Sequence, residues 1–294
     1  MEQTTEVQVN RNYKDTLFRL IFKEKENLLS LYNAMTGSTY TNVEDLEIIT
    51  LENAIYMNMK NDLAFLIDST VNLYEHQSTY SPNMPLRNLF YIAREWEMLV
   101  SQKTLYSSKL VKIPTPNFIV FYNGQDHEWL QEQLRLSDAY EKPMELPNLE
   151  LLVTVVNINY GRNGALFEKC PILKEYALYV DKVRKYNADM EIHQAVERAI
   201  EECIQEGILK DLLSRYRSEA VQMSIFEFDE EKEMRLIRAD EREIGREEGI
   251  RNFIQDNLEE NISESRIVEK LGRRFGFTQV QAEEWIQREK ECLV

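Results

Sequence analysis

Apolar residues recur at helical spacing in some segments of the chain and in short strand-like runs in others. The helical spacing predicts helices that begin at Asp15, at Pro85, near residue 170 and at residue 191, and that end near residues 37, 99, 187 and 221. The strand-like runs lie at 43–59 (one strand or two short ones), 63–67, 71–74, 118–122 and 149–159. This order of elements predicts an α/β protein with a mixed sheet flanked by helices.

Two of these runs lie close enough in the chain to form a β-hairpin. Turn-forming residues separate them, and we place the turn at Ser69 and Thr70. In that register Asp62 lies opposite Gln77. Because side chains alternate between the faces of a strand, Asp62, Glu75 and Gln77 are predicted to point to one face.

The two carboxylates on this face suggest a metal site. In the predicted register Asp62 and Glu75 are diagonal neighbours about 7 Å apart, close enough to share a cation with oxygen ligands at about 2 Å. Without a cation the pair is unfavourable, because like charges repel and burial disfavours the ionised form. The alternative interpretation is that both are ordinary exposed residues at the surface of the hairpin.

The residues around this face resemble a known family. Asp62, then Glu75-His76-Gln77 on the next strand, followed by the run from Ser78 to Arg87, are similar to the Rpn family of recombination-promoting nucleases, also classed as transposases, in the PD-(D/E)XK nuclease superfamily. The superfamily pattern has an Asp followed by Glu-x-Lys on the next strand. This chain has Gln77 where Lys is usual, a replacement that the Rpn family itself shows. Further similarity lies at 14–19, 114–124, 134–138 and 157–159, within roughly residues 10–225.

The resemblance implies a PD-(D/E)XK nuclease-like fold and a divalent-metal-dependent DNA endonuclease, linked to recombination, mobile elements or defence. Asp62 and Glu75 would bind Mg²⁺, with Mn²⁺ as a substitute, and the backbone carbonyl of His76 would be a further ligand. The His76 side chain should face away from the carboxylates. Asp15 is a further acidic candidate, although an Asp at this place also suits the start of a helix.

Two other residues would complete the candidate site. Gln77 would position water or phosphate, because an amide neither titrates nor carries charge and so replaces neither a Lys nor a general base. Arg87 would contact a phosphate group of DNA. A surface position on its helix is the alternative for Arg87, and a solvated polar position is the alternative for Gln77.

The overall charge opposes a nucleic-acid function, and the composition favours a cytoplasmic protein. The 294 residues carry a formal net charge of -16, whereas proteins that bind phosphates usually present a basic patch. Local basic residues and bound cations could offset this charge at physiological screening. The three cysteines follow no disulfide or zinc pattern. No signal-peptide pattern and no membrane-spanning apolar run is expected.

The chain from residue 226 onward differs chemically from the part before it. It contains 31 charged residues among 69, against 55 among the first 225. Mixed charges at helical spacing over 227–252 are followed by a pattern for two short amphipathic helices around Gly276. We therefore expect a nuclease-like domain with a helical extension at 1–225 and a charged helical tail at 226–294. Such a small unit buries little alone, so it should form a homodimer through the tail or pack on the main domain.

A second function fits the same sequence. The chain could be a catalytically weak or inactive protein derived from a mobile element, acting as a DNA-associated or protein-interaction module. The intact pair of carboxylates argues against such decay, whereas the acidity and the missing Lys at position 77 argue for it.

Overall fold

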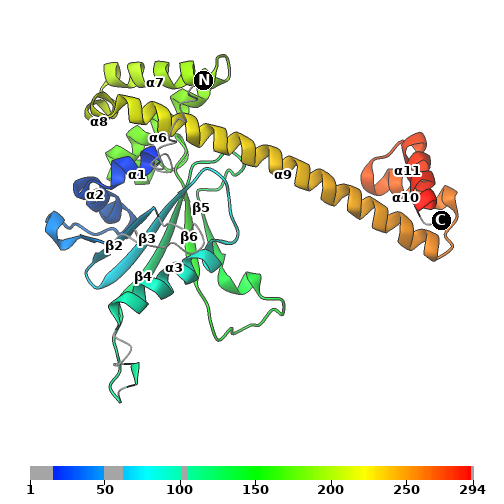
Figure 1. Cartoon of the computed structure of the whole chain (residues 1–294), viewed down its shortest axis with the longest axis horizontal. Coiled ribbons are helices and arrows are strands. Elements are labelled where there is room, and N and C mark those ends of the chain that lie inside the picture. The colour runs from blue at the N-terminus through cyan, green and yellow to red at the C-terminus, as the bar shows by residue number, and fades with distance from the viewer. Residues whose placement is uncertain (1–15, 50–61, 101–104, 107, 293–294) are drawn as a thin grey trace, which may run out of the picture. The chain divides into compact units, whose positions relative to one another are not determined.

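The computed structural model describes residues 16–49, 62–100, 105–106 and 108–292 (Figure 1). In these residues one six-stranded mixed sheet has the order β1-β2-β3-β4-β6-β5. The strands are β1 (Glu47–Ile48), β2 (Leu63–Ile67), β3 (Thr70–Gln77), β4 (Thr115–Tyr122), β5 (Gln131–Arg135) and β6 (Leu152–Asn157). The predicted α/β class with a mixed sheet is therefore confirmed.

Three neighbouring strands of the sheet run in the same direction. β3 is parallel to β4 and β4 to β6, whereas β1, β2 and β5 pair antiparallel with their neighbours. The register aligns Gln77 with Tyr122, and Tyr122 with Asn157. The carboxyl ends of β3, β4 and β6 therefore meet at one edge, which we call the carboxyl edge.

Helices cover both faces of the sheet. The helix between β3 and β4, α3 (Met84–Leu99), packs on one face, and its residues Met84, Tyr91 and Ile92 join the core there. The opposite face is covered by α1 (Leu17–Phe22), α2 (Lys25–Thr36), α5 (Gly164–Lys169) and α6 (Pro171–Asn187). The core on that side extends into α7 (Ile192–Glu206) and α8 (Lys210–Arg215).

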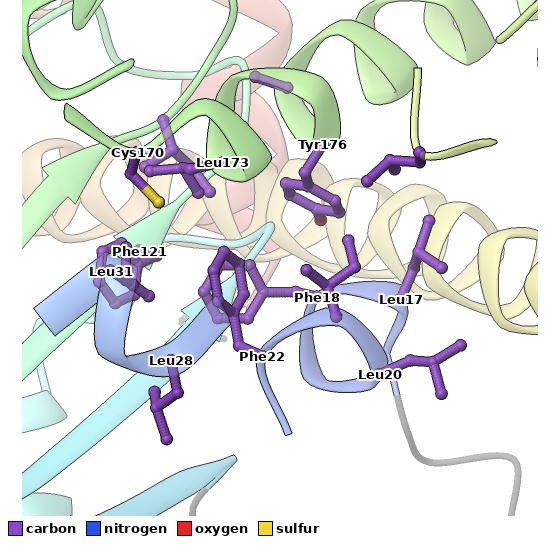
Figure 2. Packing of buried hydrophobic residues seen from close by; sticks show 14 of the residues in the cluster. Leu17, Phe18, Leu20, Phe22, Leu28, Leu31, Phe121, Cys170, Leu173 and Tyr176 are labelled. Carbon is purple, nitrogen blue, oxygen red and sulfur yellow. The ribbon is translucent and has the colours of Figure 1, made fainter. Parts of the chain in front are cut away.

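Aromatic side chains fill the core between α1, α6 and the sheet. Figure 2 shows Phe18 and Phe22 of α1 close to Tyr176 of α6. The Phe18 ring centroid lies 4.6 Å from Phe22, 5.3 Å from Phe121 and 5.6 Å from Tyr176. Burying such a side chain contributes about 1.5–3 kcal/mol, so this cluster fixes α1 and α6 against the sheet behind β3 and β4.

The hairpin forms, but the predicted register is wrong by two residues. Leu66 pairs with Val71 and Ile67 with Thr70, so the turn residues are Asp68 and Ser69. Both adopt left-handed backbone conformations, with φ of 45° and 57°. Such two-residue turns match the twist of the adjoining strands. Because the shift is an even number, each residue keeps the face predicted for it.

Helix boundaries differ from the prediction where the chain turns. The helix predicted from Asp15 to about residue 37 is two helices, α1 and α2, which are separated by Lys23 and Glu24. The helix predicted over 191–221 is also interrupted, because Gly207 caps α7 with φ of 83°. Strand β5 and helix α5 were not predicted. Asp15 itself and residues 50–59 lie outside the described residues.

The chain divides between Glu231 and Lys232 into two compact units. Helix α9 (Arg217–Glu259) contains this boundary, and α10 (Glu264–Phe275) and α11 (Gln279–Cys292) follow it. The two predicted helices around Gly276 are confirmed, and Gly276 ends α10 with φ of 73°. The second unit has its own small core, formed by Ile250, Ile254, Ile267, Leu271, Ala282 and Ile286. In the described part of the chain no helix combines the length and apolar character that a membrane span requires.

Candidate functional site

Glu75 lies near the end of β3 and is almost fully buried under α3. Glu75 is only 3% exposed, and its Oε2 accepts a hydrogen bond from Arg87 Nη2 at 3.1 Å. The same Arg87 nitrogen lies 3.3 Å from the hydroxyl of Tyr91, one turn further along α3. Arg87 is predicted to contact phosphate; the structure places it beside the candidate metal ligand, in an ion pair.

Asp62 reaches the same strand from the other side of the hairpin. It directly precedes Leu63, which pairs with Tyr74, so Asp62 lies across from Glu75 rather than from Gln77. Its Oδ2 accepts a hydrogen bond of 2.7 Å from the backbone N–H of His76. The corrected register therefore makes Asp62 and Glu75 direct cross-strand neighbours instead of diagonal ones.

Burial changes the acidity of both carboxyl groups. It raises the pKa of Glu75 to about 8; Arg87 opposes this change, and the Asp62 carboxylate adds to it. Burial also raises the pKa of Asp62, although the N–H of His76 counteracts the effect. Arg87 and Arg19 both favour the ionised form of Asp62, but their charges do not offset the effect of burial on the pKa of the pair. Without a further cation the pair retains a proton.

The donor atoms of this pair fit a hard divalent cation. Glu75 Oε1 is buried and has no hydrogen-bond partner among the described residues, so one carboxylate oxygen is unused. Among those residues, no group of three or more His, Cys, Asp or Glu side chains could hold a metal ion. Mg²⁺ does not require such a group, because it commonly binds through one or two carboxylates and keeps several water molecules.

Gln77 ends β3 on the same face as Glu75. Its side chain is half-buried, and its Nε2 lies 2.8 Å from the sulfur of Met84, the first residue of α3. The amide is therefore held at the carboxyl edge, next to the start of the helix that supplies Arg87. Its predicted positioning role is chemically compatible with this place and stays a prediction.

The side chain of His76 points to the opposite face, as predicted. Its ring stacks on Phe18 at 4.9 Å, and its Nε2 lies 2.9 Å from the hydroxyl of Tyr176. Burial lowers the pKa of His76 to about 4, so the ring is neutral at physiological pH. The side chain therefore belongs to the packing of the sheet. Metal binding by its backbone carbonyl stays a prediction.

A buried polar network surrounds His76 on this face, and the sequence did not indicate it. Glu227 of α9 has its Oε1 3.4 Å from the Tyr176 hydroxyl and 3.3 Å from Asn123 Nδ2. Arg184 donates a hydrogen bond of 2.6 Å to the backbone carbonyl of Asn123. Asn123 directly follows β4, just beyond the strand-like run predicted at 118–122. The network joins segments up to 104 residues apart, which no local pattern reveals.

Comparisons with known proteins add no family assignment. A scan against protein-family models finds no match, and searches of curated proteins and of solved structures also find none. The resemblance to the Rpn family therefore stays a prediction from the sequence.

Proposed function

We propose that this protein is a magnesium-dependent DNA endonuclease of the Rpn type. The observation that carries the proposal is the pair of the half-buried Asp62 and the buried Glu75, of which one Glu75 oxygen lacks a hydrogen-bond partner among the described residues. The element order supports it: a helical start, an antiparallel hairpin, then α3 leading to the parallel strand β4. That order agrees with the PD-(D/E)XK nuclease-like fold that the resemblance implies.

In this proposal Asp62, Glu75 and the backbone carbonyl of His76 hold Mg²⁺. When bound, the ion supplies Lewis acidity toward the phosphodiester and lowers the pKa of a coordinated water. Gln77 positions the attacking water or a phosphate oxygen through its amide. Asp62 is itself oriented by the backbone N–H of His76, which donates a hydrogen bond to its Oδ2.

Arg87 provides the positive charge that Gln77 lacks. Its side chain is 35% exposed, whereas the Glu75 side chain beside it is only 4% exposed. The guanidinium therefore lies between the buried carboxylate and solvent, where it can donate to a phosphate oxygen of a bound strand. This arrangement allows a locally cationic site despite the acidic chain.

One observation favours the second candidate, a DNA-associated or protein-interaction module without cleavage. Arg87 already forms an ion pair with Glu75 at 3.1 Å, so the site has a cation of its own. In such a module the pair would be a structural contact between β3 and α3. The two candidates differ in whether Mg²⁺ binds and whether DNA is cut.

Cleavage of supercoiled plasmid by the purified full chain, with Mg²⁺ or with EDTA, tests the proposal. Asp62→Ala and Glu75→Ala should each lower the Mg²⁺-dependent rate by more than about 100-fold, because each removes a ligand. The control is Asp68→Ala, which removes a carboxylate from the turn of the same hairpin and should leave the rate unchanged. Circular dichroism verifies that each variant is folded.

Thermal unfolding separates the two candidates without relying on cleavage. Mg²⁺ should raise the melting temperature of the wild type but not that of Asp62→Ala, since ligand binding stabilises only the state that binds it. Cleavage by both Ala variants at the wild-type rate would refute the site assignment. Absence of both Mg²⁺-dependent stabilisation and cleavage in the wild type would favour the second candidate.

A further inference from the structure

A cavity of about 280 Å³ lies on the face of the sheet that α6 covers, opposite the face that carries Glu75 and Arg87. Its wall includes Asn123 and Gly124 after β4, Asn159 after β6, and Tyr176 and Arg184 of α6. The cavity is thus formed at the carboxyl edge. In open α/β sheets this edge is the usual place for ligands.

The loop that forms one wall passes very close to the end of β3. A Cβ atom at Gly124 would lie 2.2 Å from the backbone oxygen of Ser78, so only glycine fits there. Ser78 directly follows Gln77. The loop that forms the cavity wall therefore packs against the backbone that directly follows β3, at the same edge of the sheet as the proposed cleavage site but on its other face.

Two wall residues have hydrogen-bonding capacity that the described residues leave unused. Asn123 is 2% exposed, and its Oδ1 has no partner, although its Nδ2 contacts Tyr176 and Glu227. Arg184 donates from two nitrogens to Asn159 and to the Asn123 carbonyl, whereas its Nε has no partner among the described residues. Both atoms are themselves buried, so they meet a ligand in the cavity only when these side chains turn toward it. Unused buried groups of this kind are unfavourable, which favours such a rearrangement on binding.

The charges around the cavity favour an uncharged ligand over an anion. Arg184 already lies 3.5 Å from the Glu231 carboxylate, and Arg162 lies 3.1 Å from Glu128. Asp181 is also part of the wall. Because both guanidinium groups are paired and a carboxylate is present, a phosphate would find little net positive charge.

Aromatic side chains at the cavity favour a flat ring. His127 and Tyr160 belong to the wall, and Tyr160 is 46% exposed. His127 also stacks with Trp129 at 5.5 Å and lies 4.6 Å from Tyr80, which follows β3. Aromatic groups of this kind bind bases of single-stranded nucleic acids by stacking. The volume is below the roughly 300–1,000 Å³ typical of sites for drug-sized ligands, and so suits a small ring.

We propose that this cavity binds an unpaired nucleobase. Every nucleobase presents a hydrogen-bond donor and an acceptor side by side on its edge. Asn123 Oδ1 and Arg184 Nε, once turned toward the cavity, would complement them. The further statement that this base belongs to the DNA strand being cut rests on the proposed function. The cavity would then select unpaired or distorted DNA, because a base inside a duplex cannot enter it.

Nucleoside binding to the full chain in EDTA tests the cavity independently of cleavage. The probes are the four deoxynucleosides, with deoxyribose 5-phosphate and inorganic phosphate as controls, followed by saturation-transfer NMR. We expect saturable binding of at least one deoxynucleoside at about 1 mM and none of either phosphate control. Ala177→Leu, which fills the cavity from α6, should weaken binding at least about tenfold. Ala188→Leu, the same change at the exposed end of α6, should not.

Hydrogen–deuterium exchange of the wild type provides a test that needs no variant. A bound deoxynucleoside should protect the backbone amides of 123–127 and 158–162, which form the cavity wall. Equal binding of phosphate, protection confined to other segments, or no deoxynucleoside binding at about 10 mM would overturn the proposal. Nucleoside binding by a protein that cuts no DNA would refute the nuclease and leave the cavity assignment standing. Mg²⁺-dependent cleavage without nucleoside binding would refute the cavity alone.

Discussion

Glu75 and His76 are neighbours on β3, but their side chains lie in two different polar environments on opposite faces of the sheet. Glu75 meets Arg87, and one of its carboxylate oxygens has no hydrogen-bond partner in the part of the chain that the structure describes. His76 is enclosed by Phe18, Tyr176 and Glu227, and its ring is held neutral. The difference indicates which face serves packing and which face has capacity for a ligand.

The two faces also differ in the protonation state that folding favours. On the α3 face, burial raises the pKa of a carboxyl group, so the folded protein holds a proton that the unfolded chain releases. On the α6 face, burial lowers the pKa of an imidazole, so the folded protein excludes a proton that the unfolded chain binds. The free energy of unfolding should therefore depend on pH in opposite ways for Glu75 on one face and His76 on the other, and this dependence tests the difference between the two faces.

The largest expected effect is on the stability of the metal-free protein. The pKa of Glu75 is raised from 4.5 to about 8, so the free energy of unfolding should fall as the pH rises through this interval. Glu75→Gln should reduce that fall by on the order of a few kcal/mol, because the amide has no proton to lose. Urea unfolding in EDTA at about pH 5 and about pH 8 measures it. An equal fall in the wild type and in Glu75→Gln would show that Glu75 is not the group whose proton is lost.

His76→Gln should change the opposite end of the pH range. The pKa of His76 is lowered from 6.5 to about 4, so wild-type stability should fall as the pH decreases through that interval. The variant should lose less stability over the same interval. The same urea titrations, extended to about pH 4, compare the two proteins. A variant with the wild-type acid dependence would show that His76 is not the group responsible.

A smaller effect is expected from the hydroxyl group of Tyr176. Tyr176→Phe leaves His76 Nε2 and Glu227 with fewer partners, and should cost about 2 kcal/mol of unfolding free energy. Tyr179→Phe is the matched control on the same helix, since its hydroxyl meets only Ser224 at 2.6 Å among the contacts that the structure records. It should cost about 1 kcal/mol. If urea unfolding shows a larger loss of unfolding free energy for Tyr179→Phe than for Tyr176→Phe, the Tyr176 hydroxyl does not have the role proposed for it in the polar network.

Position 77 tests the α3 face through activity. Gln77→Leu should fold and cleave at least about tenfold more slowly, because it removes the amide from the carboxyl edge. Gln77→Lys restores the residue usual in the superfamily pattern and should keep at least residual activity. The initial rate of plasmid cleavage compares them. Wild-type activity in Gln77→Leu would exclude the positioning role.

The charged helical tail should influence the oligomeric state of the protein without changing either face of the sheet. We expect a homodimer held partly by residues 232–294, and a largely monomeric protein when the chain ends after Glu231. This truncation point keeps Glu227 in its buried network, which an end at residue 225 would remove. Sedimentation of the full-length and the truncated protein at micromolar concentration measures the oligomeric state of each. Cleavage should shift toward single-strand nicks, and a full-length monomer or a truncated dimer would refute the expectation.

Several features of the fold followed from local pattern. Alternation in β2 and β3 was enough to assign Glu75 and His76 to opposite faces, and the assignment survived a register error because the error was an even number of residues. The apolar spacing after Pro85 predicted α3, and the glycine at 276 predicted the break between α10 and α11. These features depend on the conformations and spacing of residues that are close in the chain.

Other features depended on contacts that only the folded chain creates. The turn at Asp68 and Ser69 required two non-glycine residues to adopt left-handed conformations, which the sequence did not single out. The ion pair between Arg87 and Glu75 depends on how α3 packs on the sheet, and the link from His76 to Tyr176 spans 100 residues. The sequence by itself determined which residues share a face of a strand, because alternation is local. Tertiary structure decided their partners and pKa values, because burial and long-range packing set both.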